Sequence, residues 1–213
     1  MACPLLAGAT LVEVLGRLDA AAVSFRSVSS RLKRTSHTAI INDNSEETGR
    51  VQLVRVGRDV RVLIEFDEPD AKIVAFSGRK AEIYYPKIQT VQEYDLGKHK
   101  ALVEQFLLLG FGTSGKELAR NYLIKLEPEV PIDGRNTHHL VLTPKAAEVA
   151  EKLKAAELWV SETGAHVIQQ KFLERSGNYT LIRFQDLKLN PTLDPEALRL
   201  RLPPGVKREY PMK

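Results

Sequence analysis

The segment Gly110-Phe111-Gly112-Thr113-Ser114-Gly115-Lys116 has the residue types and spacing of a phosphate-binding loop. It satisfies GxGxxG and, from Gly110 to Lys116, all but the last position of GxxxxGK[ST]. That last position needs a hydroxyl group for magnesium, but Glu117 stands there, and its carboxylate would repel phosphates. Both nucleotide motifs also require a strand ending at the glycines, whereas the preceding residues have helical spacing. Gly110 and Gly112 are therefore better interpreted as hinge or helix-capping glycines.

Histidine and cysteine offer no stronger candidates for chemistry. His138 and His139 are adjacent in a predicted strand, so their side chains point to opposite faces and cannot share a metal ion. The single cysteine, Cys3, lies near the chain end and is a poor site for a nucleophile, and no GxSxG elbow occurs. The sequence therefore predicts no enzyme activity, no metal site and no cofactor.

Composition narrows the class of protein. The chain has 213 residues, of which 43% are hydrophobic and 27% charged, which is typical of a soluble globular protein. One cysteine cannot form an internal disulfide, and no apolar run approaches the roughly 20 residues that cross a bilayer. The net charge is +4, but residues 1–35 carry +3 and residues 199–213 carry +4, so the middle of the chain carries −3. Basic residues confined to the two ends do not favour nucleic-acid binding, which needs a continuous basic surface.

The first nine residues, MACPLLAGA, are predicted to be the remnant of a truncated signal peptide, because Ala7-Gly8-Ala9 fits the small-x-small cleavage rule. Two alternatives remain open: Cys3 is lipidated at the end of a lipobox, or the segment is a frayed terminus. Thr10 and Glu13 have the spacing of a capping box, which predicts that a helix begins there.

The rest of the chain alternates between two periodicities. Helical spacing predicts helices over residues 10–22, 98–109, 113–120 and 144–154, the last beginning at Pro144. A period of two predicts strands around residues 60–66, 81–85, 122–126, 138–142, 180–184 and 198–202. Turn residues separate these strands, and helices do not alternate with them. The pattern favours an antiparallel meander, and residues 10–213 are expected to form one domain.

A sheet of about ten strands that does not close must still bury its apolar face. The apolar helices available for this are the first one and the segment around residues 106–109. A concave half-barrel covered by these helices is the natural assembly. Periodicity alone leaves open whether residues 106–111 form an ordinary core helix or a lid over a hydrophobic cavity.

Four ordered strings resemble the periplasmic outer-membrane lipoprotein carriers of the LolA type. The family has a strand that opens with Gly and reaches Arg six residues later, as Gly49 and Arg55 do. Residues 69–80 and Tyr84-Tyr85-Pro86 resemble its Pro-Asp turn, strand, Gly turn and aromatic pair before Pro. The strings LVLTPK at 140–145 and PPGV at 203–206 resemble two further family segments. The chain departs at Val56, where the family usually has Pro.

The resemblance implies an α+β, mainly antiparallel fold. The expected architecture is an incomplete β-barrel of about 10–11 strands with a helical lid enclosing an apolar cavity. It implies a monomeric periplasmic carrier that binds the acyl chains of lipoproteins. The expected partners are acylated lipoproteins, an inner-membrane ABC lipoprotein exporter, an outer-membrane acceptor and, transiently, the membrane surface. Arg55 stands where the family's arginine holds the lid closed by hydrogen bonding. Glycolipid carriers and envelope-stress sensor domains with the same fold remain alternatives.

The expected site residues follow from the strand pattern and the resemblance together. The lid is expected to contain Phe106, Leu107, Leu109 and Phe111, with Gly110 and Gly112 as hinges. The cavity is expected to be lined by Val60, Val62, Ile64, Phe66, Ile83, Tyr85, Ile124, Leu142 and Phe184.

Overall fold

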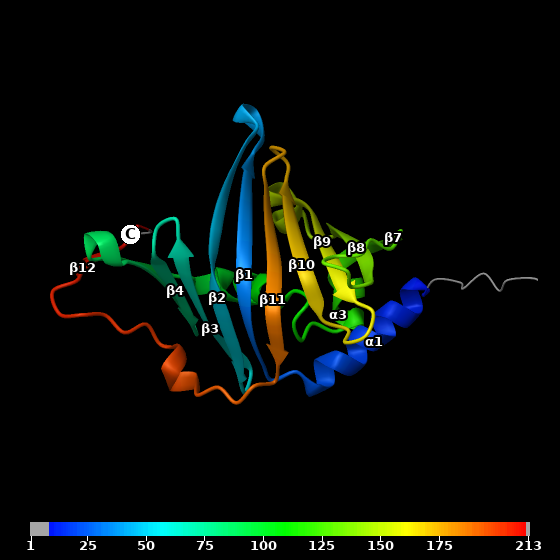
Figure 1. Cartoon of the computed structure of the whole chain (residues 1–213), viewed down its shortest axis with the longest axis horizontal. Helices are drawn as coiled ribbons and strands as arrows, with labels where there is room; N and C mark the ends of the chain where they lie inside the picture. The colour runs from blue at the N-terminus through cyan, green and yellow to red at the C-terminus, as the bar shows by residue number, and fades with distance from the viewer. Residues whose placement is uncertain (1–8, 212–213) are drawn as a thin grey trace, which may run out of the picture.

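The computed structural model describes residues 9–211, and the predicted signal remnant, with Cys3, lies outside the described residues apart from Ala9. Within that range one open sheet of twelve strands dominates, in the order β12-β6-β5-β4-β3-β2-β1-β11-β10-β9-β8-β7. Every pairing is antiparallel except β12 with β6. Figure 1 shows β1 and β11 in front, with both flanks curving back toward the helices. The predicted open, mainly antiparallel fold is confirmed.

The sheet consists of two antiparallel meanders, β1 to β6 and β7 to β11, in place of the single meander expected from the sequence. Residues 96–121, which include α2 and α3, connect β6 near one edge of the sheet to β7 at the other edge. The helices are α1 Leu11–Ser24, α2 Lys100–Leu108, α3 Gly115–Asn121 and α4 Ala147–Lys152. The strands are β1 Ser27–Thr38, β2 Asp43–Val56, β3 Asp59–Glu68, β4 Lys72–Ser77, β5 Lys80–Tyr85, β6 Thr90–Asp95, β7 Tyr122–Glu127, β8 Thr137–Pro144, β9 Leu153–Ser161, β10 Val167–Glu174, β11 Tyr179–Leu189 and β12 Lys207–Glu209. No helix in the described part of the chain is long and apolar enough to cross a membrane.

The first helix begins where the capping-box spacing predicts. The side-chain hydroxyl of Thr10 accepts from the backbone N–H of Glu13, and the carboxylate of Glu13 accepts from the backbone N–H of Thr10 at 2.7 Å. Two donors that the helix start would leave unpaired are thereby satisfied. Val14 and Leu18, one turn apart, are buried on the face that α1 turns toward the sheet.

The concave side of the sheet is covered in two different ways. Over β7, β8 and β9 it packs against α1 and α3, whose Val14, Leu18 and Leu118 are fully buried. Gly115 allows this packing, because a Cβ on it would collide with the backbone of Leu15. Over β1, β2 and β3 the cover is α2, which has no fully buried residue among its nine. One half is therefore a filled core, and the other half is covered more loosely.

Two predictions about local structure are wrong. Residues 198–202 do not form a strand: Leu198 ends a 3-10 helix, Pro195–Leu198, and is itself buried. The Pro203-Pro204 pair that follows lacks backbone N–H donors for a ladder, so pairing resumes only at β12. Pro144 does not start a helix but ends β8, and α4 begins at Ala147.

Candidate functional site

An apolar cavity of about 260 Å³ lies between α2 and the central strands. Its wall contains one polar side chain, Gln170, and otherwise consists of aliphatic and aromatic groups. The lining residues come from β1, β2, β3, β10, β11, α2 and the segment after α2: Val28, Leu32, Val51, Leu53, Val62, Ile64, Val103, Phe106, Leu107, Phe111, Gln170, Phe172, Ile182 and Phe184. Such a wall can bind hydrocarbon but offers almost no directional interactions.

The period of two explains the strand contribution to this wall. Val62 and Ile64 share one face of β3, and their ladder partners on β2 are Leu53 and Val51. The cover adds aromatic contacts, because Phe111 meets Phe184 edge to face with ring centroids 4.9 Å apart. Four apolar side chains from two strands therefore lie together beneath the cover.

The cavity is small compared with most ligand-binding pockets. Pockets for drug-sized ligands span roughly 300–1,000 Å³, and this one is about 260 Å³. The strands of the cavity wall are held in continuous ladders on both sides of the cavity, whereas α2 has no fully buried residue.

Arg55 holds the segment after α2 in place. Its Nη2 donates to the backbone carbonyl of Gly112 at 3.2 Å, and its guanidinium lies over the ring of Phe25 at 5.5 Å. A Cβ on Gly112 would lie 2.9 Å from Arg55 Nη2 and closer still to the Phe25 ring. Gly112 also has a φ of +76°, which favours glycine. The lack of room for a Cβ and the positive φ therefore both require glycine at position 112.

Gly110 is constrained in the same way. Its φ is +82°, and a Cβ there would collide with the side chain of Val167 on β10. The residue before it, Leu109, is fully buried, and its carbonyl accepts from the side-chain amide of Gln170. The end of the cover is thus fixed to β10, while α2 itself stays partly exposed.

Polar contacts at its edges hold α2 against the sheet. Lys100 pairs with Asp59 of β3, and Gln105 donates to the hydroxyl of Tyr122 on β7 at 2.9 Å. Burial raises the pKa of the Tyr122 hydroxyl, so it stays protonated at neutral pH.

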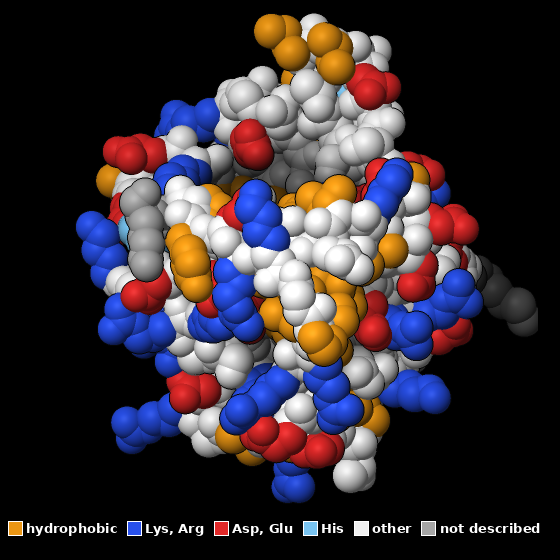
Figure 2. Space-filling view, turned by 90° about the vertical axis from the view of Figure 1, so that its left-hand side faces the viewer, with side chains coloured by type: hydrophobic (Ala, Val, Ile, Leu, Met, Phe, Trp, Pro, Cys, Tyr) orange, Lys and Arg blue, Asp and Glu red, His pale blue; other side chains and the backbone are white. Residues whose placement is uncertain are grey.

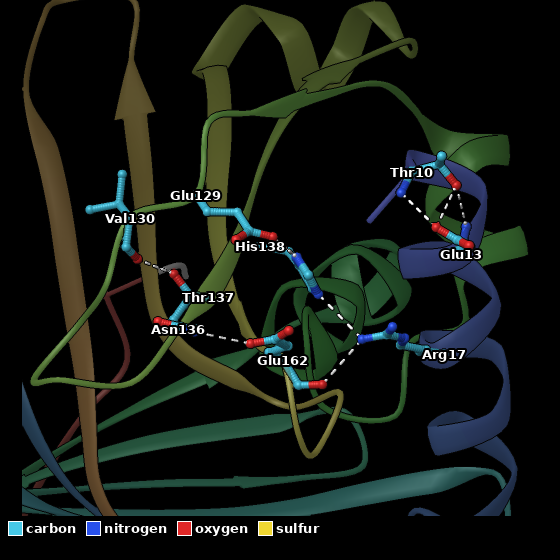
Figure 3. Close-up of polar contacts among 9 residues, drawn as sticks. All are labelled: Thr10, Glu13, Arg17, Glu129, Val130, Asn136, Thr137, His138 and Glu162. Atoms are coloured by element: carbon cyan, nitrogen blue, oxygen red, sulfur yellow. Dashed lines mark hydrogen bonds and ion pairs between the residues drawn. The ribbon is translucent and has the colours of Figure 1, made fainter. Parts of the chain in front are cut away.

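Figure 3 shows the polar contacts that attach helix α1 to the neighbouring strands and loops. Arg17 donates to Nε2 of the buried His138 at 3.4 Å and to the backbone carbonyl of Glu162 at 3.2 Å. Because arginine can only donate, Nε2 accepts and Nδ1 carries the proton toward Glu129, 3.0 Å away. The backbone N–H of Lys116 on α3 in turn donates to Asp19 of α1. These contacts join α1 and α3 to the filled half of the molecule.

The structure divides the expected site residues into three groups. Those that line the cavity are Val62, Ile64, Phe184, Phe106, Leu107 and Phe111. Those that belong to the surrounding core without lining it are Val60, Phe66, Ile124, Leu142 and Leu109. Those placed elsewhere are Ile83, half-buried on β5, and Tyr85, which lines a separate hollow near Ile88.

These corrections have a physical reason. Ile124 and Leu142 face the concave side as expected, but they lie on β7 and β8, against which α1 and α3 pack. Ile83 and Tyr85 lie on β5, three strands from β2 in the sheet, beyond the reach of α2. Eight lining residues were not expected from the sequence: Val28, Leu32, Val51, Leu53, Val103, Gln170, Phe172 and Ile182. Alternation within β1, β2, β10 and β11 could have indicated the apolar ones on these strands.

The histidines form no shared site. His138 faces the filled core, whereas His139 stacks on Trp159 on the other face and pairs with Glu157 at 2.9 Å. Their predicted separation to opposite faces is confirmed. Among residues 9–211 no group of three or more His, Cys, Asp or Glu side chains is arranged to hold a metal ion. The glycines of residues 110–115 follow helix α2 and not a strand.

Known proteins share this architecture. A family model described as outer membrane lipoprotein carrier protein LolA matches residues 24–200. The chain belongs to the LolA family. This confirms the resemblance found in the sequence, and the match spans β1 to β11, including every strand of the cavity wall. No significant match was found among curated proteins.

Solved structures share the LolA-like fold at low sequence identity. An uncharacterized conserved protein from Thermus thermophilus is 15% identical, with a TM-score of 0.58, covering 93% of this chain and 98% of that one. The lipoprotein LppX of Mycobacterium tuberculosis is 13% identical, with a TM-score of 0.52 and coverages of 86% and 98%. The Pseudomonas aeruginosa MucA/MucB complex gives 18% identity and a TM-score of 0.51, with 91% of this chain covered. The chain spans only 62% of the length of that matched chain.

Proposed function

We propose that this protein is a carrier that binds the acyl chains of lipoproteins in its cavity and transfers them from the inner to the outer membrane. The observation that carries the proposal is the apolar cavity under α2. The segment that follows α2 is held by the hydrogen bond from Arg55 to the backbone carbonyl of Gly112. Membership of the LolA family supports it.

The physical need for such a carrier is large. Each methylene exposed to water costs about 0.8 kcal/mol, so acylated cargo cannot cross an aqueous compartment unshielded. A wall with one polar side chain can shield hydrocarbon without recognising its detailed shape. Binding then opens the lid: acyl chains displace Phe106 and Leu107, and Arg55 releases the carbonyl of Gly112.

We infer the remaining parts of the proposal from membership of the LolA family and from the sequence of the first nine residues. The protein acts as a monomer in the periplasm, without enzyme activity, after removal of a signal peptide that ends near residue 9. Residues 10–213 act as one domain. It receives cargo from an inner-membrane ABC exporter, delivers it to an outer-membrane acceptor and contacts membrane surfaces only transiently. Transfer needs no nucleotide in the carrier, because successive affinities give it direction.

A binding experiment with acylated cargo tests the proposal. Purified protein is mixed with a synthetic tripalmitoylated cysteine peptide and examined by native mass spectrometry. We expect a one-to-one complex, and we expect Phe106→Asp to weaken it at least tenfold, because a carboxylate resists burial among apolar side chains. Val12→Asp, at a residue that is 79% exposed on α1, is the matched control. Absence of a complex, or equal binding by Phe106→Asp, would contradict the proposal.

A second candidate function is peptide or glycolipid binding without lipoprotein transfer. The structural similarity to a chain of the MucA/MucB complex supports binding of a peptide or protein partner, and the similarity to the lipoprotein LppX shows that the fold also occurs outside lipoprotein carriers. Co-purification of a peptide or glycolipid, combined with failure to bind the tripalmitoylated peptide, would favour this second function.

A further inference from the structure

Three charged side chains continue the inner wall at one end of the cavity. Arg34 of β1 and Lys72 of β4 both form ion pairs with Glu47 of β2. In the β1–β11 ladder Arg34 lies opposite Ile182, which lines the cavity. Lys72 lies opposite Phe66 in the β3–β4 ladder. We call Arg34, Glu47 and Lys72 the rim cluster, because the apolar wall ends there.

The rim cluster has an excess of positive charge. Its two cations share one carboxylate, and the side chains of Arg34, Glu47 and Lys72 are only 33%, 15% and 20% exposed. Both cations lie over the Phe66 ring, at 5.2 Å and 4.8 Å from its centroid. Partly buried cations are costly unless anions balance them. A second anion at this place would remove the imbalance.

Arg34 also retains unused hydrogen-bonding capacity. Its Nε atom is shielded from solvent and has no hydrogen-bond partner among the described residues. A guanidinium offers five N–H donors and an ammonium three, whereas Glu47 supplies two acceptor oxygens. A phosphate group has several charged oxygens and fits a cation pair of this kind.

Space for a polar group exists beside the cluster. A hollow of about 480 Å³ is lined by Glu47, Pro69, Asp70, Ala71, Lys72, Tyr85, Lys87 and Ile88. Asp70 and Lys87 face it as an exposed ion pair with a distance of 3.4 Å, so they leave the net charge unchanged. Figure 2, which looks from the side of β4, β5 and β6, shows the surface hollowed at the foot of the projecting β1–β2 hairpin. Glu47 and Lys72 thus line this hollow, while Arg34 pairs with Glu47 and lies opposite Ile182 of the cavity wall.

We propose that the rim cluster binds the phosphate head group of an anionic lipid whose acyl chains occupy the cavity. The inference rests on the proposed function, since it needs a cavity that takes acyl chains. It adds a second class of ligand for that cavity, because the diacylglyceryl cysteine of a lipoprotein carries no phosphate. Hydrocarbon supplies affinity without selectivity, and the two cations supply a preference for phosphate over an uncharged head group.

Competition between three small ligands tests this site in the intact protein. The uncharged fluorophore N-phenyl-1-naphthylamine reports occupation of the cavity, and it is displaced by decyl phosphate, decanol or inorganic phosphate below micellar concentrations. We expect the wild type to bind decyl phosphate about tenfold more tightly than decanol, as charge-assisted hydrogen bonds predict. Inorganic phosphate should not displace the fluorophore.

Variants separate a binding role from a structural one. Arg34→Met with Lys72→Met keeps the apolar stems and should reduce the tenfold preference to about one. Glu47→Gln removes the competing carboxylate and should increase the preference, whereas a merely structural ion-pair cluster would only lose stability. The control is Lys33→Met, on the opposite face of β1, where Lys33 pairs with Glu46 at 2.8 Å. Thermal unfolding confirms that each variant is folded.

Each outcome decides one question. If decanol and decyl phosphate displace the fluorophore equally, the rim site is refuted and the acyl-chain cavity stands. If the double variant keeps the preference, the rim site is also refuted. If inorganic phosphate competes as well as decyl phosphate, the site binds free anions and the lipid assignment fails. If neither fluorophore nor amphiphile binds, the proposed function and the rim site both fail.

Discussion

Replacing Arg55 with Met removes the charged donor that holds the segment after α2, while the methionine keeps an apolar stem against Phe25. The Nη2 to Gly112 carbonyl distance is 3.2 Å, and Arg55 is half-buried. We expect Arg55→Met to favour the open lid and to increase the affinity for apolar ligands.

The size of the effect follows from the strength of this hydrogen bond. A hydrogen bond from a charged donor contributes about 1.5–3 kcal/mol, and the long distance places this one near 1.5 kcal/mol. About 1.4 kcal/mol corresponds to a tenfold change in an equilibrium constant. A protein that is mainly closed binds its ligand with an affinity reduced by the open fraction. The apparent Kd for an apolar ligand should therefore fall by up to about tenfold.

Titration with N-phenyl-1-naphthylamine measures that Kd by fluorescence. The matched control is Arg50→Met on the same strand, because Arg50 lies on the opposite face and pairs with Glu65 at 3.2 Å. An unchanged Kd in Arg55→Met, in a variant that still unfolds cooperatively, would refute the latch. Weaker binding would show that Arg55 shapes the cavity and does not close it.

Three further predictions concern stability. Leu142→Ala should lower the free energy of unfolding by about 2–5 kcal/mol without changing fluorophore affinity, since Leu142 is fully buried in the filled half. Thr10→Ala should lower it by about 0.5–2 kcal/mol through loss of the α1 cap. The hydrogen bond from His139 lowers the pKa of the Glu157 carboxyl group. The ionised carboxylate therefore stabilises the folded state above the ordinary carboxyl pKa, and this stabilisation is lost as the pH falls through the lowered pKa. Glu157→Gln should therefore reduce the decrease in the free energy of unfolding at acidic pH.

Denaturant unfolding at several pH values measures all three. A Leu142→Ala variant with altered fluorophore affinity would contradict the division into a filled half and a cavity half. A Thr10→Ala variant as stable as wild type would show that tertiary packing alone holds α1. An unchanged acid slope in Glu157→Gln, matching the exposed Glu151→Gln control on α4, would contradict the Glu157 prediction.

Much of the fold could be predicted from local patterns, because those patterns act over a few residues. The Thr10 to Glu13 spacing predicted the start of α1, and the two required donors and acceptors lie within one helical turn. Alternation in β3 correctly placed Val62 and Ile64 on one face. The local pattern failed at residues 198–202, where Leu198 is buried in a 3-10 helix and not in a strand.

The site was less predictable, since a period of two tells which residues share a face but not what covers that face. Leu142 and Val62 have the same sequence pattern, yet Leu142 is buried in the core on β8 while Val62 lines the cavity under α2. The difference depends on where helices distant in sequence pack.

By itself the sequence determined the open antiparallel class, the family, and the glycines that flank Phe111. Only the tertiary structure decided which half of the concave face stays hollow and which strand lies beside which. It alone brings Arg34, Glu47 and Lys72 together from three strands, and it alone pairs β12 in parallel with β6. Such pairings join residues far apart along the chain, and they are selected by burial of the whole apolar surface and not by any local preference.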